Sequence, residues 1–156
     1  MDEKYKLSIK KISFRHKDNN ITTKMIILVE NIVGKMFVKD KSVISINREY
    51  EIEIIFENVG NLNYPGGHYF YSGMNMSLIQ SDGKMDEIPP IEVGKEGTSL
   101  GSLLLNGFLK DLRIKVESET ETYHKNIYVI DSLAIVISIL LSLALTIIVE
   151  TIHLIY

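Results

Sequence analysis

The 156-residue chain contains no cysteine and no tryptophan, and it has only three prolines. Without cysteine, a disulfide scaffold, thiol catalysis and thiolate metal sites are all excluded. A large excess of positive charge is also missing, because the net charge is −3 and the pI is about 5.8, so we expect no nucleic-acid partner. With 46% apolar residues the chain is too hydrophobic to be disordered, and its length fits one domain with an appendage.

The most hydrophobic stretch lies near the C-terminus, from Ser132 to Val149. These eighteen residues contain no charge, no glycine and no proline. As a helix they would extend roughly 27 Å, close to the ~30 Å hydrocarbon core of a bilayer. A domain of about 130 residues cannot enclose a helix that is apolar on every face, which argues against a buried core helix. We therefore expect residues 131–156 to form a transmembrane tail anchor in the lipid bilayer, with Asp131 and Glu150 at the headgroups.

The N-terminal sequence MDEKYKLSIKK lacks the positive segment and the apolar run of a secretory signal. Lysine and arginine lie on the N-terminal side of the apolar stretch, with Lys125 nearest, and none follows it. By the positive-inside rule we expect a cytoplasmic N-terminal domain. The opposite, extracytoplasmic orientation would be favoured if the glycosylation triplets at Asn20 and Asn75 carried glycans.

Residues 1–131 follow a period of two rather than 3.6. Between Tyr50 and Phe56 every second residue is apolar and glutamates fill most of the intervening positions, which is typical of a half-buried antiparallel strand. Further strands are predicted at 5–14, 24–30, 36–39, 42–46, 74–78, 91–93, 100–105 and 112–116. The apolar parity switches at Lys10 and Lys11, which indicates a β-bulge or a strand that passes between two sheets.

No amphipathic helix is evident before residue 120. Turn residues separate the predicted strands, and this spacing favours an all-β sandwich or barrel. We therefore divide the chain into a β-sandwich domain over residues 1–117, a connector over 118–130 and the anchor over 131–156.

The strand Ile52–Asn61, IEIIFENVGN, ends in an Asn-Val-Gly-Asn turn. It is followed by an apolar segment at 74–79, by Asp82-Gly83, by a proline pair and by a strand at 112–116. Over residues 42–117 this succession resembles CARDB-like and related immunoglobulin-like β-sandwiches of prokaryotic surface and membrane proteins. The resemblance implies a seven-stranded sandwich with an adhesive or spacer role outside the cell. The fold class we predict is thus mainly β, an immunoglobulin-like antiparallel β-sandwich followed by a single C-terminal transmembrane helix.

Residues with catalytic or metal-binding chemistry are sparse. The four histidines show no metal-ligand spacing; they are His16, His68, His124 and His153. Ser99 and Ser102 have no histidine near them in the sequence. We expect no catalytic residue, no metal and no cofactor.

The segment from Tyr64 to Tyr71, YPGGHYFY, is one candidate binding site. Its candidate partner-binding residues are Tyr64, His68, Tyr69, Phe70 and Tyr71. Tyrosine provides a large contact area at low entropic cost and is enriched at interface hot spots. The hypothesis is that this loop contacts a partner or the membrane surface, and the alternative is that its rings close the end of the sandwich.

Small residues recur every four positions along the predicted anchor helix, at Ala134, Ser138, Ser142 and Thr146. Small side chains allow close approach of a neighbouring backbone, so this stripe predicts packing against a transmembrane helix of another membrane protein or of a second copy. The alternative is a passive anchor in which these residues have no partner.

Charge is distributed unevenly along the chain. Residues 1–48 hold 11 basic and 5 acidic residues, whereas residues 49–131 hold 6 basic and 14 acidic residues. The pattern favours two solvated faces of opposite sign. A functional alternative is docking of the basic strands on anionic lipid or on an acidic subunit.

These observations predict a non-enzymatic single-pass membrane protein whose β-sandwich is an interaction or accessory module of a membrane complex. One alternative is an exported β-sandwich with an adhesive or envelope role. Another is a ligand-binding sensor, which requires an apolar pocket with converging polar groups.

Overall fold

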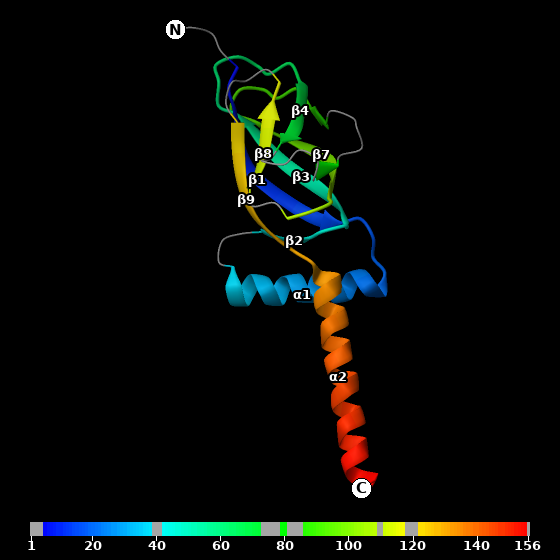
Figure 1. The fold of residues 1–156 in the computed structure, drawn as a ribbon. Coiled ribbons are helices and arrows are strands. Elements are labelled where there is room, and N and C mark those ends of the chain that lie inside the picture. The colour runs from blue at the N-terminus through cyan, green and yellow to red at the C-terminus, as the bar shows by residue number, and fades with distance from the viewer. Residues whose placement is uncertain are drawn as a thin grey trace.

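The structure is a computed structural model that describes residues 5–38, 42–72, 79–80, 86–108, 111–117 and 122–155. Two β-sheets lie at one end, helix α1 crosses beneath them, and helix α2 projects away from them as an isolated rod (Figure 1). The elements are β1 Leu7–His16, α1 Ile21–Phe37, β2 Ser42–Ser45, β3 Glu49–Asn58, β4 Gly67–Ser72, β5 Ile79–Gln80, β6 Asp86–Ile88, β7 Glu96–Leu105, β8 Asp111–Val116, β9 Thr122–Ile130 and α2 Ser132–Ile155.

The chain is mainly β, as predicted, and its strands form two sheets. The four-stranded sheet has the order β1-β3-β7-β5 and is antiparallel throughout. The five-stranded sheet has the order β2-β9-β8-β4-β6, and in it β2 runs parallel to β9. The prediction of purely antiparallel pairing is therefore wrong at one edge. Parallel neighbours need a long connection, and here residues 46–121 lie between β2 and β9.

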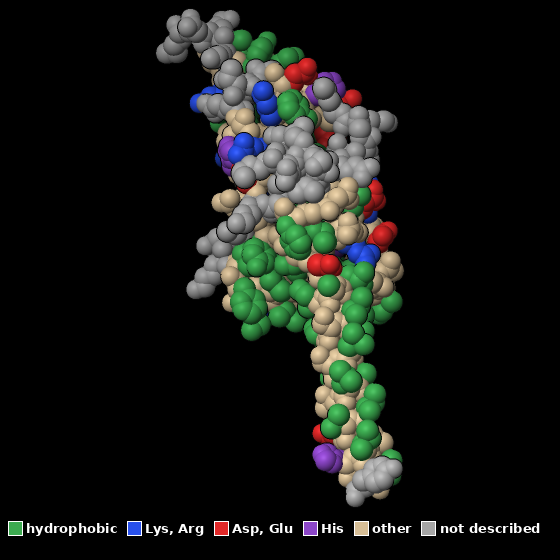
Figure 2. Space-filling view, in the orientation of Figure 1, with side chains coloured by type: hydrophobic (Ala, Val, Ile, Leu, Met, Phe, Trp, Pro, Cys, Tyr) green, Lys and Arg blue, Asp and Glu red, His purple; other side chains and the backbone are tan. Residues whose placement is uncertain are grey.

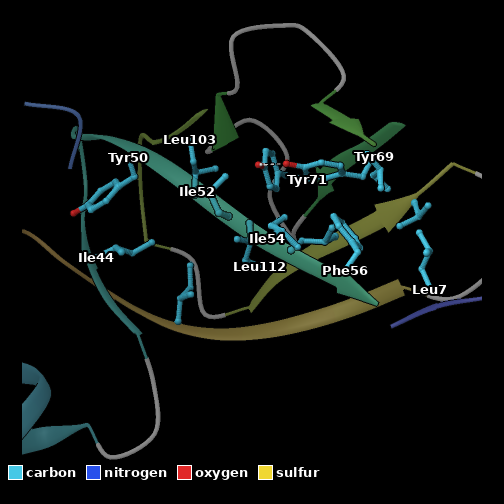
Figure 3. Close-up of a cluster of buried hydrophobic side chains, with 14 of the residues drawn as sticks. Leu7, Ile44, Tyr50, Ile52, Ile54, Phe56, Tyr69, Tyr71, Leu103 and Leu112 are labelled. Atoms are coloured by element: carbon cyan, nitrogen blue, oxygen red, sulfur yellow. Dashed lines mark hydrogen bonds between the residues drawn. The ribbon is translucent and has the colours of Figure 1, made fainter. Parts of the chain in front are cut away.

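The core lies between the two sheets, and β3 forms its centre. Tyr50, Ile52, Ile54 and Phe56 are each at most 1% exposed, which confirms the predicted alternation. Apolar residues of β8 face them from the other sheet; these are Leu112, Ile114 and Val116. Figure 3 shows Ile54 and Phe56 beside Leu112 and Tyr69, with side chains of both sheets interleaved.

The predicted irregularity in the first strand is a β-bulge. The pairing of β1 with β3 shifts register between Ile9 and Lys11, and the strand continues in the same sheet. The extra residue in the bulge shifts the sequence alternation by one, so that Leu7 and Ile9 before it and Ile12 and Phe14 after it all pack against the same core.

Basic residues of the first strand lie beside acidic residues of β3 in the four-stranded sheet. Three cross-strand ion pairs join β1 and the residue that follows it to β3; they are Lys10–Glu57 at 2.9 Å, Arg15–Glu51 at 3.7 Å and Lys17–Glu49 at 3.7 Å. The hydrogen bond and charge of Glu57 raise the pKa of Lys10. These three ion pairs neutralise part of the charge asymmetry of the sequence within the sheet.

The segment predicted as a connector contains strand β9. Residues Thr122–Ile130 pair with β8 on one side and with β2 on the other. Its side chains alternate between exposed and less exposed positions from Tyr123 to Val129, but only Ile127, Val129 and Ile130 are buried. Because the first half of β9 is polar, the sequence did not predict this strand, which lies between β2 and β8 in the sheet.

Helix α1 overturns the prediction of strands at 24–30 and 36–39, and with it the expectation of no amphipathic helix before residue 120. Asn20, which begins one of the two glycosylation triplets, is the N-cap, and its side-chain Oδ1 accepts a hydrogen bond from the Thr23 backbone N–H at 2.8 Å. The helix is apolar on two sides, so the usual contrast between an apolar and a polar face is weak.

Helix α2 has 24 residues and is long and apolar enough to cross a membrane. At 1.5 Å per residue it extends roughly 36 Å. Within it only Ser132 and Val136 are buried, so nearly all of its apolar side chains face outward. Two other sequence predictions, the strand at 74–78 and the glycosylation site at Asn75, lie outside the described residues.

Candidate functional site

The two helices meet the sheets at a buried group of polar side chains. This basal cluster consists of His16, Glu30, Ser45, Tyr50 and Ser132, which come from β1, α1, β2, β3 and α2 respectively. Each of the five thus belongs to a different element.

Glu30 is the centre of the basal cluster and is only 9% exposed. Its Oε1 accepts hydrogen bonds from the Ser45 hydroxyl at 2.5 Å and from the Tyr50 hydroxyl at 2.6 Å. Its Oε2 lies 2.9 Å from Nε2 of His16, which donates when that nitrogen carries the proton. A buried carboxylate is tolerated when several donors satisfy its oxygens, and Glu30 has three.

Ser45 extends the network from Glu30 to the start of α2. Its hydroxyl proton is donated to Glu30, so the Ser132 hydroxyl donates to Ser45 Oγ at 2.5 Å. The Ser45 backbone N–H donates to the Tyr50 hydroxyl oxygen at 2.6 Å. Burial, together with the nearby Glu30 carboxylate, raises the pKa of Tyr50, so this phenol stays protonated and donates.

The order of groups in the basal cluster shows what it can do chemically. A nucleophilic serine requires an imidazole against its hydroxyl, with the carboxylate behind that imidazole. Here the carboxylate of Glu30 lies between His16 and Ser45, so His16 cannot take the serine proton. The His16 ring instead packs against Tyr50, with ring centroids 4.4 Å apart. The arrangement is suited to holding elements together.

An apolar contact completes the joint between α1 and α2. Val29 of α1, Ile130 of β9 and Val136 of α2 form a small core of their own. Asp131, the only residue between β9 and α2, caps the helix by accepting a hydrogen bond from the Ala134 backbone N–H at 3.0 Å. Helix α2 therefore leaves the domain without a flexible linker.

The tyrosines of the predicted binding loop are mainly core residues. Tyr64, Tyr69 and Tyr71 are 2%, 0% and 7% exposed, so their rings are enclosed by the domain itself. Burial raises the pKa of Tyr69 to about 12, and its hydroxyl lies 3.4 Å from that of Tyr71. His68 and Phe70 are half-buried and point away from the core by strand alternation.

The small-residue stripe lies on the surface of α2. Ala134, Ser138 and Ser142 line a shallow groove along the helix. The hydroxyls of the stripe bond to carbonyl oxygens one turn earlier; these bonds are Ser138 to Ala134 at 2.8 Å, Ser142 to Ser138 at 2.8 Å and Thr146 to Ser142 at 2.9 Å. They are thus satisfied within the helix, and the groove offers close approach rather than unpaired donors.

In the described part of the chain, no group of three or more His, Asp or Glu side chains is arranged to hold a metal ion. Ser99, noted in the sequence as a serine without a nearby histidine, donates to the Glu87 carbonyl oxygen at 2.5 Å. No protein-family profile, curated protein or solved structure matches the chain.

Sequence reasoning missed the basal cluster. His16 was considered only for metal spacing, and Glu30 was placed in a predicted strand. One usable signal was present, a single acidic residue within the apolar run MIILVENIV between an N-capping Asn20 and residue 37. Ser45 and Ser132 are 87 residues apart, and no local pattern links them.

Replacing a loop tyrosine tests the core assignment. Tyr69→Ala should lower the free energy of unfolding of the full-length protein by about 3–5 kcal/mol, because it empties a fully buried ring site. Phe70→Ala, at the adjacent half-buried position, is the control and should cost far less. Urea unfolding in detergent micelles, followed by circular dichroism, measures both. Equal stability of the two variants would contradict the assignment.

Removing one donor tests the basal cluster. Tyr50→Phe deletes a hydrogen bond to the buried Glu30 carboxylate and should destabilise the protein by about 1.5–3 kcal/mol. Tyr128→Phe, on the 44% exposed Tyr128 of β9, is the matched control and should stay within about 0.5 kcal/mol of the wild type. The same unfolding measurement applies, and a neutral Tyr50→Phe would show that Glu30 does not depend on this donor.

Proposed function

We propose that this chain is a single-pass membrane protein whose immunoglobulin-like β-domain is presented at the bilayer surface as an interaction or accessory module of a membrane complex. It acts by binding rather than by catalysis. The observation that carries the proposal is the outward-facing apolar surface of α2 together with the rigid joint that ties α2 to the domain.

The exposure of α2 supports lipid as its surroundings. Ile139, Leu140 and Leu145 are 51%, 51% and 62% exposed, and they lie on different sides of the helix. In water each such side chain would forgo roughly 1.5–3 kcal/mol of burial free energy. A helix apolar all round is stable when hydrocarbon surrounds it.

The short connection between β9 and α2 supports the proposal that α2 holds the β-domain at the bilayer surface. Strand β9 passes into α2 through Asp131 alone, and Ser132 is bonded to Ser45 in the neighbouring strand. Helix and domain are therefore fixed relative to each other. A domain mounted in this way presents the same surfaces at the same height above the membrane, which suits a module that contacts a neighbouring membrane protein.

The groove on α2 supports association within the membrane. Small side chains at Ala134, Ser138 and Ser142 allow another helix to approach closely. The partner helix belongs to a second copy of this chain or to another membrane protein.

Charge introduced into α2 tests membrane insertion. Leu140→Lys combined with Leu141→Lys places two cations near the middle of the helix, each costing about 2.5–3.5 kcal/mol in a bilayer. We expect the wild-type protein to stay with membranes after alkaline carbonate extraction and the double variant to be released. Leu100→Lys, on the 60% exposed Leu100 of β7, is the control and should remain bound. Release of the wild-type protein would overturn the proposal.

Bulky residues in the groove test helix association. Ser138→Leu combined with Ser142→Leu should weaken association in membranes, because leucine fills the groove that admits a second helix. The change of Ile137 and Leu140 to alanine, on the side of α2 opposite the groove, is a control that should keep association. Proximity cross-linking of the full-length protein in native membranes measures the loss, and unchanged cross-linking in the leucine variant would refute packing through the groove.

A further inference from the structure

Helix α1 has an apolar face that no described element covers. The core side of α1 is formed by residues such as Ile26 and Val29. A second stripe, spaced by three or four residues along another side, consists of Ile21, Met25, Leu28, Ile32 and Met36, which are 74%, 37%, 60%, 46% and 69% exposed. Residues at this spacing lie on one side of a helix, so the stripe runs the full length of α1.

The position of this stripe is set by α2. Figure 1 shows α1 lying across the axis of α2, beneath the sheets and at the level where α2 begins. Val29 of α1 packs with Val136 in the second turn of α2, which fixes that level. Figure 2 shows hydrophobic side chains gathered at the base of the domain beside the start of α2, continuous with those along α2.

The charges of α1 complement an anionic surface. The helix contains two lysines and one acidic residue, Glu30, which is buried in the basal cluster. Lys24 and Lys35 are exposed and lie four and three residues from Leu28 and Ile32, on the border of the stripe. Lysines at the edge of an apolar helix face extend their charge toward lipid headgroups while their stems cover apolar surface.

We propose that α1 lies in the interfacial layer of the same bilayer that α2 crosses, with its apolar stripe among the acyl chains and Lys24 and Lys35 at the headgroups. The proposal rests on α2 spanning the membrane. Lipid covers the stripe of α1 in this proposal, because the stripe is continuous with the exposed surface of α2 and lies at the depth where α2 enters the hydrocarbon.

Single-site spin labels measure this directly, because the chain has no native cysteine. Leu28→Cys and Ile32→Cys report on the stripe, Leu141→Cys reports on the span, and Leu100→Cys on β7 is the aqueous control. Each full-length variant is reconstituted in vesicles of phosphatidylcholine mixed with phosphatidylglycerol. Accessibility to oxygen and to a water-soluble nickel chelate is then compared by power saturation.

We expect oxygen to relax the labels at Leu28 and Ile32 several-fold more effectively than nickel does, at a depth shallower than that of Leu141, while Leu100 shows the reverse preference. If Leu141 is in lipid and the stripe labels match Leu100, the inference is overturned and the proposed function stands. Stripe labels shielded from both reagents would show a protein partner instead of lipid. A water-accessible Leu141 would overturn both proposals.

A double substitution in the stripe provides a second test of the proposal. With the label at Met25, Leu28→Glu combined with Ile32→Glu should move that label to the aqueous phase, because two carboxylates oppose insertion, while a label at Leu141 stays in lipid. Leu100→Glu is the matched control and should leave the Met25 label at its original depth. An unmoved Met25 label in the double variant would overturn the inference.

Discussion

The buried carboxylate of Glu30 is the interaction on which the rest of the architecture depends. Removing a carboxylate from water costs several kcal/mol unless its oxygens are well bonded. Glu30 is bonded by side chains of three other elements and is linked to α2 through Ser45. The two sheets and helix α1 are therefore positioned together, because a shift of any one of them would leave part of this charge unpaired. Helix α2 is joined to the same network through the hydrogen bond between Ser132 and Ser45.

A second constraint follows from chain continuity at the base. Strand β9 is held between β8 and β2, and after Asp131 it becomes α2. An apolar helix attached by a flexible linker would let the domain move freely above a membrane. Here Ser132 and Val136 are buried in the domain, so the first turns of α2 belong to the fold, and the remaining length is available for lipid.

The parts of the fold that sequence predicted are those with a strong local period. Strand β3 alternates between buried and half-buried side chains over its whole length, and the bulge in β1 left a visible change of parity. Helix α1 was not predicted, because apolar residues on its exposed and core-facing sides together conceal a 3.6-residue period, so that MIILVE is indistinguishable from a buried strand. The basal cluster was not predicted for a different reason. Its members come together only when five separate elements have folded into place.

The two helices together restrict how the domain sits on a membrane. A spanning helix alone tolerates tilts of about 20°, and such a tilt would carry the domain with it. Helix α1 has 17 residues and is roughly 26 Å long, so a 20° tilt along its axis would displace one end relative to the other by about 9 Å. That displacement is as large as the ~5–10 Å depth to which an interfacial helix inserts. Tilting along α1 would therefore move part of the stripe into water. In the proposed arrangement, α1 thus limits the tilt of α2 relative to the bilayer normal and holds the β-domain at a constant distance from the membrane surface.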